Sequence, residues 1–327
     1  MNNPLHALDV KSLDEYLFPT GEFPDRTGPR TDAVFIQQDG KVIYEKYANN
    51  YTLTTKHLLW SISKSILSLL AGIAVDEGKL KIEDSICKYG FDRHCDLRVQ
   101  HLLEWSSGLE WSETYEENES PTKSSVLQML YGEGRDDKAE YVIEKNAEAN
   151  PGERWNYSSG DSMLLSAVIH HAFKDEPNYF HQKLANPLDW NAFWETDRKN
   201  HLVGSSYLYL NARDLAKAGE LFLNSGKWKN VQIVTPAWLS YSLKPSTARR
   251  EKSSTNADPI GGAQWWLNRT SENNPKFWPE LPEDTFAALG HWGQILLVIP
   301  SQKLIAVRLG DTRDNSYTHR EFGRLLK

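Results

Sequence analysis

The stretch Trp60-Ser61-Ile62-Ser63-Lys64-Ser65 places a serine hydroxyl one helical turn before a lysine amine. Residues three apart on a helix share a face, with Cβ atoms about 5 to 6 Å apart, so the amine of Lys64 can reach the hydroxyl of Ser61. Burial favours the neutral form of a lysine, which can then accept the hydroxyl proton. Unpaired amides at the start of the helix can stabilise the oxyanion that follows attack on a carbonyl. The stretch therefore predicts a serine nucleophile activated by a lysine.

Two other Ser-x-x-Lys sequences occur in the chain, and their surroundings differ. Ser85 to Lys88 lies in a charged segment, and Ser120 to Lys123 contains a proline in a polar run, so neither precedes a helix that can be buried. Behind Ser61, apolar residues recur at helical spacing until Gly78, which favours a helix end. These apolar residues are Ile62, Ile66, Leu69, Leu70, Ile73 and Ala74. The context therefore selects Ser61.

Composition excludes several classes of function. The chain has 327 residues and a net charge of -7, so we expect no broad basic surface and no nucleic-acid partner. No apolar run approaches the roughly 18 residues of a membrane span, and residues 1–16 lack a basic region followed by an apolar run, so we expect a cytoplasmic location without a membrane partner. Cys87 and Cys95 lack further ligands at zinc spacing, so we expect free thiols and no metal. The oligomeric state stays open.

Strand patterns lie at both ends of the chain. Residues 32–38 and 41–47 alternate on either side of Asp39-Gly40, a strong hairpin signal. Near the carboxyl end, strands are expected at 264–267, 287–290, 295–299 and 304–309. Because strands need partners, the simplest assembly joins both ends in one antiparallel sheet with helices packed on it, an α+β fold.

The middle of the chain has mostly helical patterns, with helices expected at 162–173, 212–223 and 236–243 and a mobile loop at 246–262. One further helix is expected near each end of the chain, at 10–17 and 318–326. We therefore predict a discontinuous sheet domain, residues 1–78 plus 253–327, and an inserted helical domain, residues 79–252.

A second motif runs from Pro151 to Asp161 and contains Tyr157 and Ser159. If the segment is extended, residues two apart share a side, so the phenol and the hydroxyl would face one pocket. A phenol beside a cationic lysine has a lowered pKa and can relay protons. The alternative is a serine-rich turn that caps the next helix, with Asp161 as a helix-start residue rather than a catalyst.

A third motif, Gly290-His291-Trp292-Gly293-Gln294, lies between two strand patterns. Its glycines allow the backbone to approach a ligand closely, and the backbone amide of Gln294 can complete an oxyanion hole with that of Ser61. The alternative is a hairpin turn with a half-buried tryptophan.

These three motifs, in this order, resemble those of the serine β-lactamases and penicillin-binding proteins, whose motif set begins with Ser-x-x-Lys. The likeness is closer to the class C-like branch, which includes esterases, D-aminopeptidases and 6-aminohexanoate-dimer hydrolases. The resemblance implies a β-lactamase/transpeptidase-like fold with Ser61, Lys64 and Tyr157 as catalytic residues. Ser159 stands where an asparagine is usual, and His291, Trp292 and Gly293 occupy the third motif.

Two departures bear on the substrate. The third motif usually carries a lysine and a hydroxyl that hold the carboxylate of a lactam, whereas His291 is only partly charged at its ordinary pKa and Trp292 has no hydroxyl. We therefore expect an amide or ester hydrolase that needs no cofactor, acts on a small molecule and forms an acyl-enzyme, with Tyr157 or His291 activating the water. Two roles stay open, contact with the substrate and packing, for each of Trp111, Glu113, Tyr115, Trp266 and Trp292. The alternatives are a β-lactamase, a D-aminopeptidase, a transacylase or a penicillin-binding sensor without turnover.

Overall fold

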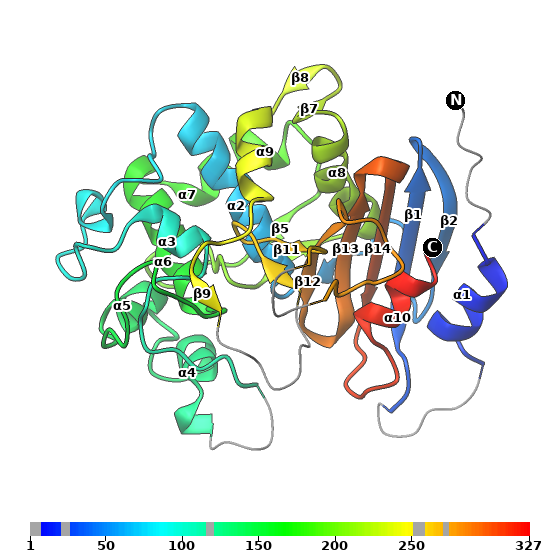
Figure 1. Cartoon of the computed structure of the whole chain (residues 1–327), viewed down its shortest axis with the longest axis horizontal. Coiled ribbons are helices and arrows are strands. Elements are labelled where there is room, and N and C mark those ends of the chain that lie inside the picture. Colours follow the sequence, from blue (N-terminus) through cyan, green and yellow to red (C-terminus); the bar gives the residue numbers. More distant parts are fainter. Residues whose placement is uncertain (1–7, 21–26, 116–120, 251–258, 271–274) are drawn as a thin grey trace.

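The computed structural model describes residues 8–20, 27–115, 121–250, 259–270 and 275–327. Its centre is a seven-stranded antiparallel sheet in the order β10-β11-β12-β13-β14-β1-β2 (Figure 1). The strands are β1 (Thr31–Gln38), β2 (Lys41–Tyr47), β10 (Ile260–Gly261), β11 (Trp266–Leu267), β12 (Phe286–Gly290), β13 (Gln294–Ile299) and β14 (Leu304–Gly310). The pairing of β1 with β14 joins the two ends of the chain, so the predicted α+β architecture is confirmed.

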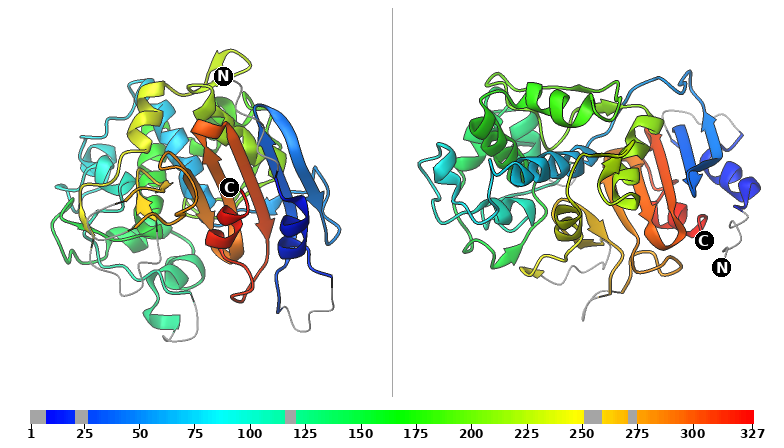
Figure 2. Two further views of the ribbon diagram at one scale, coloured as in Figure 1. Left: turned by 45° about the vertical axis from the view of Figure 1, so that its right-hand side comes forward. Right: turned by 90° about the horizontal axis from the view of Figure 1, so that it is seen from above.

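Both faces of this sheet are covered. Successive side chains of a strand point to opposite faces, so Ala33 and Phe35 lie in one apolar cluster and Val34 and Ile36 in the other. Two terminal helices, α1 (Val10–Leu17) and α10 (His319–Arg324), cover the second face, as Figure 2 shows. The first face packs against α2 (Ile62–Asp76) and α8 (Ala212–Leu223).

Helix α2 is buried on every side from Ile62 to Ala74, as expected for a helix that is apolar all round. Its three interior serines are hydrogen-bonded. Ser65 Oγ donates to Gln264 O at 2.6 Å, Ser68 Oγ donates to Ala263 O at 2.8 Å, and Ser63 Oγ accepts from the amide of Leu208 at 3.2 Å. These bonds hold the start of α2 against two distant segments of the chain.

Further helices lie mostly in the middle of the sequence, and two short 3₁₀ ones, η5 (His291–Gly293) and η6 (Pro300–Gln302), connect strands of the central sheet. The others are α3 (Val99–Leu103), α4 (Ser125–Tyr131), α5 (Lys138–Ile143), α6 (Ser159–Phe173), α7 (Glu176–Phe180), α9 (Pro236–Ser242), the 3₁₀ segments η2 (Ile86–Tyr89) and η3 (Pro121–Lys123), and the π-helical η4 (His181–Ala185). Among the described residues, none of these helices has the length and apolar character that crossing a membrane requires. The larger apolar cluster runs from this region onto the sheet, and the predicted two-domain boundaries remain a prediction.

Short strands tie the helical region together. A small sheet contains β3 (His57–Leu58), β6 (Leu208–Leu210) and β5 (Phe193–Trp194), and β7 (Lys227–Trp228) pairs with β8 (Val231–Gln232). The segment 246–262, predicted as a loop, contains β9 (Arg249–Arg250), which pairs in parallel with β4 (Arg154–Trp155), and the edge strand β10. The loop prediction was wrong there because the Arg250 guanidinium packs over the Trp155 ring at 4.5 Å, a contact between distant residues; residues 251–258 lie outside the described part.

The strand expected at 264–267 is shorter than predicted. Gln264 has φ of 66°, a left-handed conformation that interrupts a strand, and only Trp266–Leu267 pair with β12. The buried Gln264 amide nitrogen donates to Leu102 O at 2.8 Å, and its oxygen accepts from Ser162 Oγ at 2.7 Å. Gln264 therefore links the edge of the sheet to α3 and α6.

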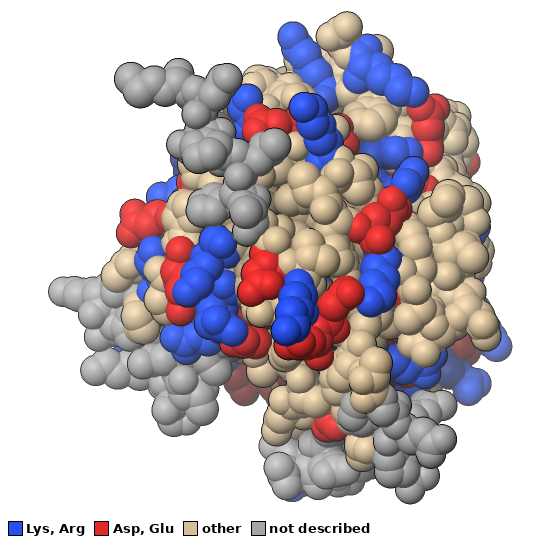
Figure 3. Space-filling view, turned by 90° about the vertical axis from the view of Figure 1, so that its right-hand side faces the viewer, with Lys and Arg blue, Asp and Glu red and all other residues tan. Residues whose placement is uncertain are grey.

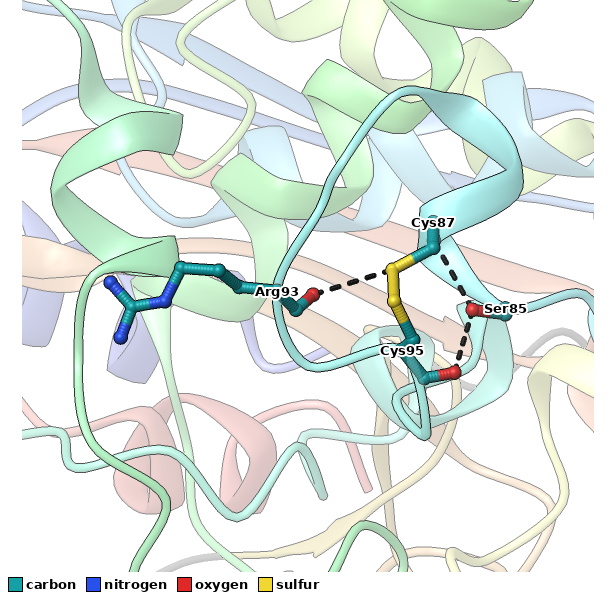
Figure 4. Close-up of a disulfide and its surroundings, with 4 residues drawn as sticks. All are labelled: Ser85, Cys87, Arg93 and Cys95. Atoms are coloured by element: carbon teal, nitrogen blue, oxygen red, sulfur yellow. Dashed lines mark hydrogen bonds between the residues drawn. A yellow bond between two sulfur atoms is a disulfide. The ribbon is translucent and has the colours of Figure 1, made fainter.

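Cys87 and Cys95 form a disulfide, so the expectation of free thiols was wrong (Figure 4). Their Cα atoms lie 5.2 Å apart because the chain turns back at Gly90, which has φ of 96°. Ser85 Oγ accepts from the amide of Cys87 at 3.2 Å and donates to Cys95 O at 2.7 Å. The absence of further cysteine or histidine ligands argued against a zinc site, but it did not bear on whether the two thiols form a disulfide. That depends on the turn, which brings them together.

The surface on the side of α1 carries basic and acidic side chains in alternation, as Figure 3 shows. Lys46 on β2, for example, lies 3.0 Å from Asp14 on α1. Charges on this face are therefore paired locally and do not gather in one patch of a single sign.

Candidate active site

Ser61 lies at the start of α2, immediately after a strained turn. Trp60 has φ of 49°, in the left-handed region, and Ser61 is half-buried. Lys64 Nζ lies 2.9 Å from Ser61 Oγ and donates a second hydrogen bond, of 3.0 Å, to Ser205 O. The side chain of Lys64 is only 1% exposed. The helical spacing thus brings the amine and the hydroxyl into contact, as the sequence predicts.

Burial changes the acidity of this lysine. The loss of solvent around Lys64 lowers its pKa to about 8, and the negative charge of Glu113 acts in the opposite direction. At that pKa, roughly a tenth of the amine is neutral at pH 7, compared with less than a thousandth at the ordinary lysine value. A neutral amine beside Ser61 Oγ has a lone pair that can accept the hydroxyl proton.

The second motif reaches the same place. Lys64 Nζ lies 5.0 Å from the centroid of the Tyr157 ring, and that ring packs against Trp105 at 4.9 Å and Trp266 at 5.2 Å between centroids. Trp266 is 8% exposed, so most of its surface is used in this packing. The structure therefore brings Ser61, Lys64 and Tyr157 together and holds the tyrosine ring among tryptophans.

Glu113 collects hydrogen bonds from several predicted site residues. Its carboxylate accepts from the Ser159 amide at 2.9 Å and the Ser159 hydroxyl at 2.5 Å. It also accepts from Trp111 Nε1 at 2.5 Å and Tyr115 Oη at 3.4 Å. Sequence reasoning left Glu113 open between substrate contact and packing, and it missed that this carboxylate joins Trp111, Tyr115 and Ser159. The period-two spacing of Trp111, Glu113 and Tyr115 was the available signal, because it places all three on one side of an extended segment.

The third motif lies beside the turn that carries Ser61. A Cβ on Gly290 would lie 2.4 Å from Leu59 O, so only glycine allows β12 to approach that turn this closely. The ring of His291 stacks on Tyr115 at 4.7 Å and meets the edge of Trp60 at 5.5 Å. The Trp292 ring lies 5.1 Å from Trp60. Two rings of the third motif thus pack against Trp60, in the turn that carries Ser61.

Gln294 is held through its side chain. Its amide nitrogen donates to His291 O at 2.9 Å, its amide oxygen accepts from the Gly310 amide at 2.8 Å, and the residue is fully buried. Gly293, with φ of 91°, packs against Arg308, which donates to Gly293 O at 2.9 Å. These bonds fix the backbone of the third motif, and the oxyanion role of the Gln294 backbone amide stays a prediction.

The remaining candidates have other partners. Lys88 Nζ bonds to Asp84 at 2.6 Å and Ser85 Oγ to the backbone of Cys95, while Ser120 of the third Ser-x-x-Lys lies outside the described residues. Asp161 lies in the first turn of α6, as predicted for a helix-start residue. It accepts from Ser107 Oγ at 2.6 Å, and burial raises its pKa to about 7.

Comparison with known proteins agrees with this arrangement. Residues 21–322 match the family described as Beta-lactamase. A 6-aminohexanoate-dimer hydrolase of Paenarthrobacter ureafaciens is 22% identical over 306 residues, which cover 88% of this chain and 74% of the relative. A Bacillus anthracis structure that carries the provisional name of 6-aminohexanoate-dimer hydrolase has a TM-score of 0.71 and 20% identity, covering 91% of this chain and 77% of its own.

A second solved structure, the hydrolase EstCE1, which is described as having promiscuous acyltransferase activity, has a TM-score of 0.68 and 17% identity. The match covers 90% of this chain and 91% of that protein. At such identities the structural matches establish a shared fold, and the family match extends over nearly the whole chain. The chain belongs to the beta-lactamase family, and it is a hydrolase of that superfamily.

Proposed function

We propose that this protein hydrolyses a small amide or ester through an acyl-enzyme on Ser61. The observation that carries the proposal is the 2.9 Å contact between Ser61 Oγ and Lys64 Nζ, with the lysine excluded from solvent. Such a contact matters chemically because proton transfer to a base within hydrogen-bond distance accompanies attack by a serine hydroxyl. The tyrosine ring beside Lys64 supports a role for Tyr157 in the same proton path.

In the proposed reaction, Ser61 Oγ forms a bond to the substrate carbonyl carbon while its proton passes to the neutral Lys64, directly or through Tyr157. The negative carbonyl oxygen is held by the backbone amides of Ser61 and Gln294. The intermediate collapses as the bond to the leaving amine or alcohol breaks, and the transferred proton goes to that leaving group. Water then attacks the acyl-enzyme and gives one proton to Tyr157 or His291. The bond between Ser61 Oγ and the acyl carbon breaks, the acid leaves, and the proton returns to Ser61 Oγ.

The third motif supports a substrate other than a β-lactam. His291 is enclosed by the rings of Tyr115, Trp60 and Trp292, where lactam-recognising relatives have a lysine. A wall of rings favours apolar or flat substrate groups over a carboxylate, which needs charged hydrogen-bond donors. The names of the relatives, which mention aminohexanoate dimers and acyl transfer, support amide and ester bonds as the first classes to try.

The proposal is tested by intact mass after incubation with a fluorophosphonate, with Ser61→Ala as the variant and Ser85→Ala as a matched control in a second Ser-x-x-Lys sequence. We expect one adduct on the native protein and on Ser85→Ala, and none on Ser61→Ala, because of these two serines only Ser61 contacts a buried lysine. An adduct that persists in Ser61→Ala would overturn the proposed nucleophile.

A substrate panel distinguishes the related activities. The panel contains p-nitrophenyl esters, linear amide oligomers, D-alanyl peptides and nitrocefin, each with and without an added acceptor alcohol. Turnover of esters or linear amides supports the proposal, whereas nitrocefin or D-alanyl peptides as the best substrates support the β-lactamase or D-aminopeptidase alternatives. Stoichiometric acylation without turnover supports a sensor, and product transfer to the alcohol supports a transacylase.

A further inference from the structure

A cavity of about 580 Å³ lies in the helical region, away from the candidate active site. Three histidines, His170, His171 and His201, line it, and we call it the histidine cavity. His170 and His171 belong to the last turns of α6, whose first residue, Ser159, bonds to Glu113 in the active site. His170 follows Ser159 by eleven positions, so at 1.5 Å per residue the two places are about 17 Å apart along the helix.

Side chains that bind metals converge at one end of this cavity. One ligand atom each from Asp137, Asp197 and His201 lie within 4.8 Å of one another. The ring of His170 lies 4.7 Å from that of His201, measured between centroids. Two carboxylates and one imidazole therefore share one location, and a second imidazole, from the end of α6, lies beside it.

His201 has an unused nitrogen at this place. The residue is only 6% exposed, and within the described part of the chain its Nδ1 atom has no hydrogen-bond partner. Asp197 Oδ2 lies 3.4 Å away, but without the geometry of a hydrogen bond. The Nδ1 atom of His170 is also buried and without a partner among the described residues. A buried polar atom without a partner is costly, so two in one cluster indicate a missing ligand.

The local field favours a cation. The carboxyl end of α6, where His170 and His171 lie, carries the negative end of the helix dipole. Four carboxylates, those of Asp92, Asp137, Glu140 and Glu144, line the same cavity against two lysines, Lys174 and Lys199, so the lining has a net negative charge.

We propose that His201, His170, Asp137 and Asp197 form a binding site for one zinc-type divalent transition-metal ion. Mixed imidazole and carboxylate ligands suit Zn²⁺ better than Mg²⁺ or Ca²⁺, which prefer oxygen alone. Asp197 is already oriented, because its Oδ1 accepts from the amides of Lys199 and His201 at 2.9 and 3.0 Å. Asp137 is half-buried, and its Oδ1 accepts from the Glu140 amide at 3.0 Å. Its Oδ2 lies 4.0 Å from the exposed Lys199, a weak contact, so this second oxygen can face the ion.

The ion would have a structural role, distinct from the serine chemistry. It would join the loop that carries Asp197 and His201 to the start of α5, which Asp137 caps, and to the end of α6. Because metal binding to the folded state adds to the free energy of unfolding, these three segments would become more stable together.

The test titrates ZnCl₂ into tag-free protein that has been dialysed against a chelator, with calorimetry for stoichiometry and Co²⁺ absorption for tetrahedral coordination. We expect one equivalent in the native protein, and a dissociation constant raised roughly tenfold or more in His201→Gln and Asp137→Asn. His181→Gln, which removes an exposed histidine elsewhere, is the matched control and should bind as the native protein does.

Asp137→Asn keeps the experiment decisive if His201→Gln does not fold, because Asp137 is half-buried. Circular dichroism and fluorophosphonate labelling of Ser61 check that each variant is folded. Absence of zinc binding in the native protein, or equal binding in the native protein and both variants, would overturn the proposal. The proposal would also be overturned if inorganic phosphate, and not zinc, raised the free energy of unfolding and this effect disappeared in His201→Gln.

Discussion

Lys64 carries the proposed chemistry because it is buried, and its acidity can be measured. Only the neutral amine can accept the proton of Ser61, so kcat/KM for an ester should rise with pH and level off above the Lys64 pKa of about 8. The measurement is a pH profile of the native enzyme with a p-nitrophenyl ester, corrected for spontaneous hydrolysis. Activity that is highest below this pH, and falls as pH rises through it, would contradict a neutral lysine as the base.

Glu113 influences that profile from a distance. Its negative charge raises the pKa of Lys64, so Glu113→Gln should lower that pKa and move the rising limb of kcat/KM to lower pH. If Glu113 only held neighbouring side chains in place, the substitution would reduce kcat/KM without moving the rising limb of the pH profile. Glu110→Gln, at an exposed position in the same segment, is the control and should leave the limb in place. A limb that stays fixed or moves to higher pH in Glu113→Gln would refute the electrostatic role.

Strand β12 and the turn before α2 position the site through one close approach. In Gly290→Ala, the new Cβ would lie 2.4 Å from Leu59 O, and because that atom belongs to the backbone, the strand or the turn must shift. We expect a loss of about 1 to 3 kcal/mol in the free energy of unfolding, together with a lower kcat per folded molecule. Urea unfolding and active-site titration measure the two effects separately.

Gly40→Ala provides the matched control for this substitution. Gly40 has φ of 73° in the β1–β2 hairpin, and nothing lies within 4 Å of its added Cβ. It should destabilise the protein through backbone strain and leave kcat per folded molecule unchanged. A Gly290→Ala variant with native kcat would show that the approach of β12 to the turn does not position Ser61.

The disulfide bears on the stability of the whole molecule. It closes a short loop, and two residues of that loop, Gly90 and Phe91, also line the histidine cavity. A cross-link over so short a loop is expected to contribute about 2 to 3 kcal/mol to the free energy of unfolding. Urea unfolding measures this contribution. The free energy of unfolding should fall by that amount when reductant is added to the native protein, and also in the double variant Cys87→Ser/Cys95→Ser. Reductant should have no effect on the double variant, and two reactive thiols in the denatured, unreduced native protein would contradict the bond.

This bond also bears on the predicted cytoplasmic location. Disulfides persist in oxidising compartments and are rare where thioredoxin and glutathione keep thiols reduced. The thiol measurement on freshly isolated protein therefore tests the location and the bond together.

Local sequence was sufficient for features that depend on neighbours along the chain. Asp39-Gly40 predicted the β1–β2 hairpin, and alternation predicted the central strands, since a strand repeats every two residues. The apolar period behind Ser61 predicted α2 and, with it, the contact to Lys64, because a helix places residues three apart on one face.

Tertiary structure decided what depends on distant residues. The lowered pKa of Lys64 comes from the segments packed around it, among them the one that supplies Ser205 O. Glu113 bonds to Ser159 across 46 positions of sequence, and the left-handed Gln264 reaches two helices, so local sequence does not identify either partner. His170 and His201 likewise meet only because α6 and the loop before β6 pack together. Desolvation and long-range contacts arise only when the chain has folded, whereas helical and strand periodicities are written in the order of the residues.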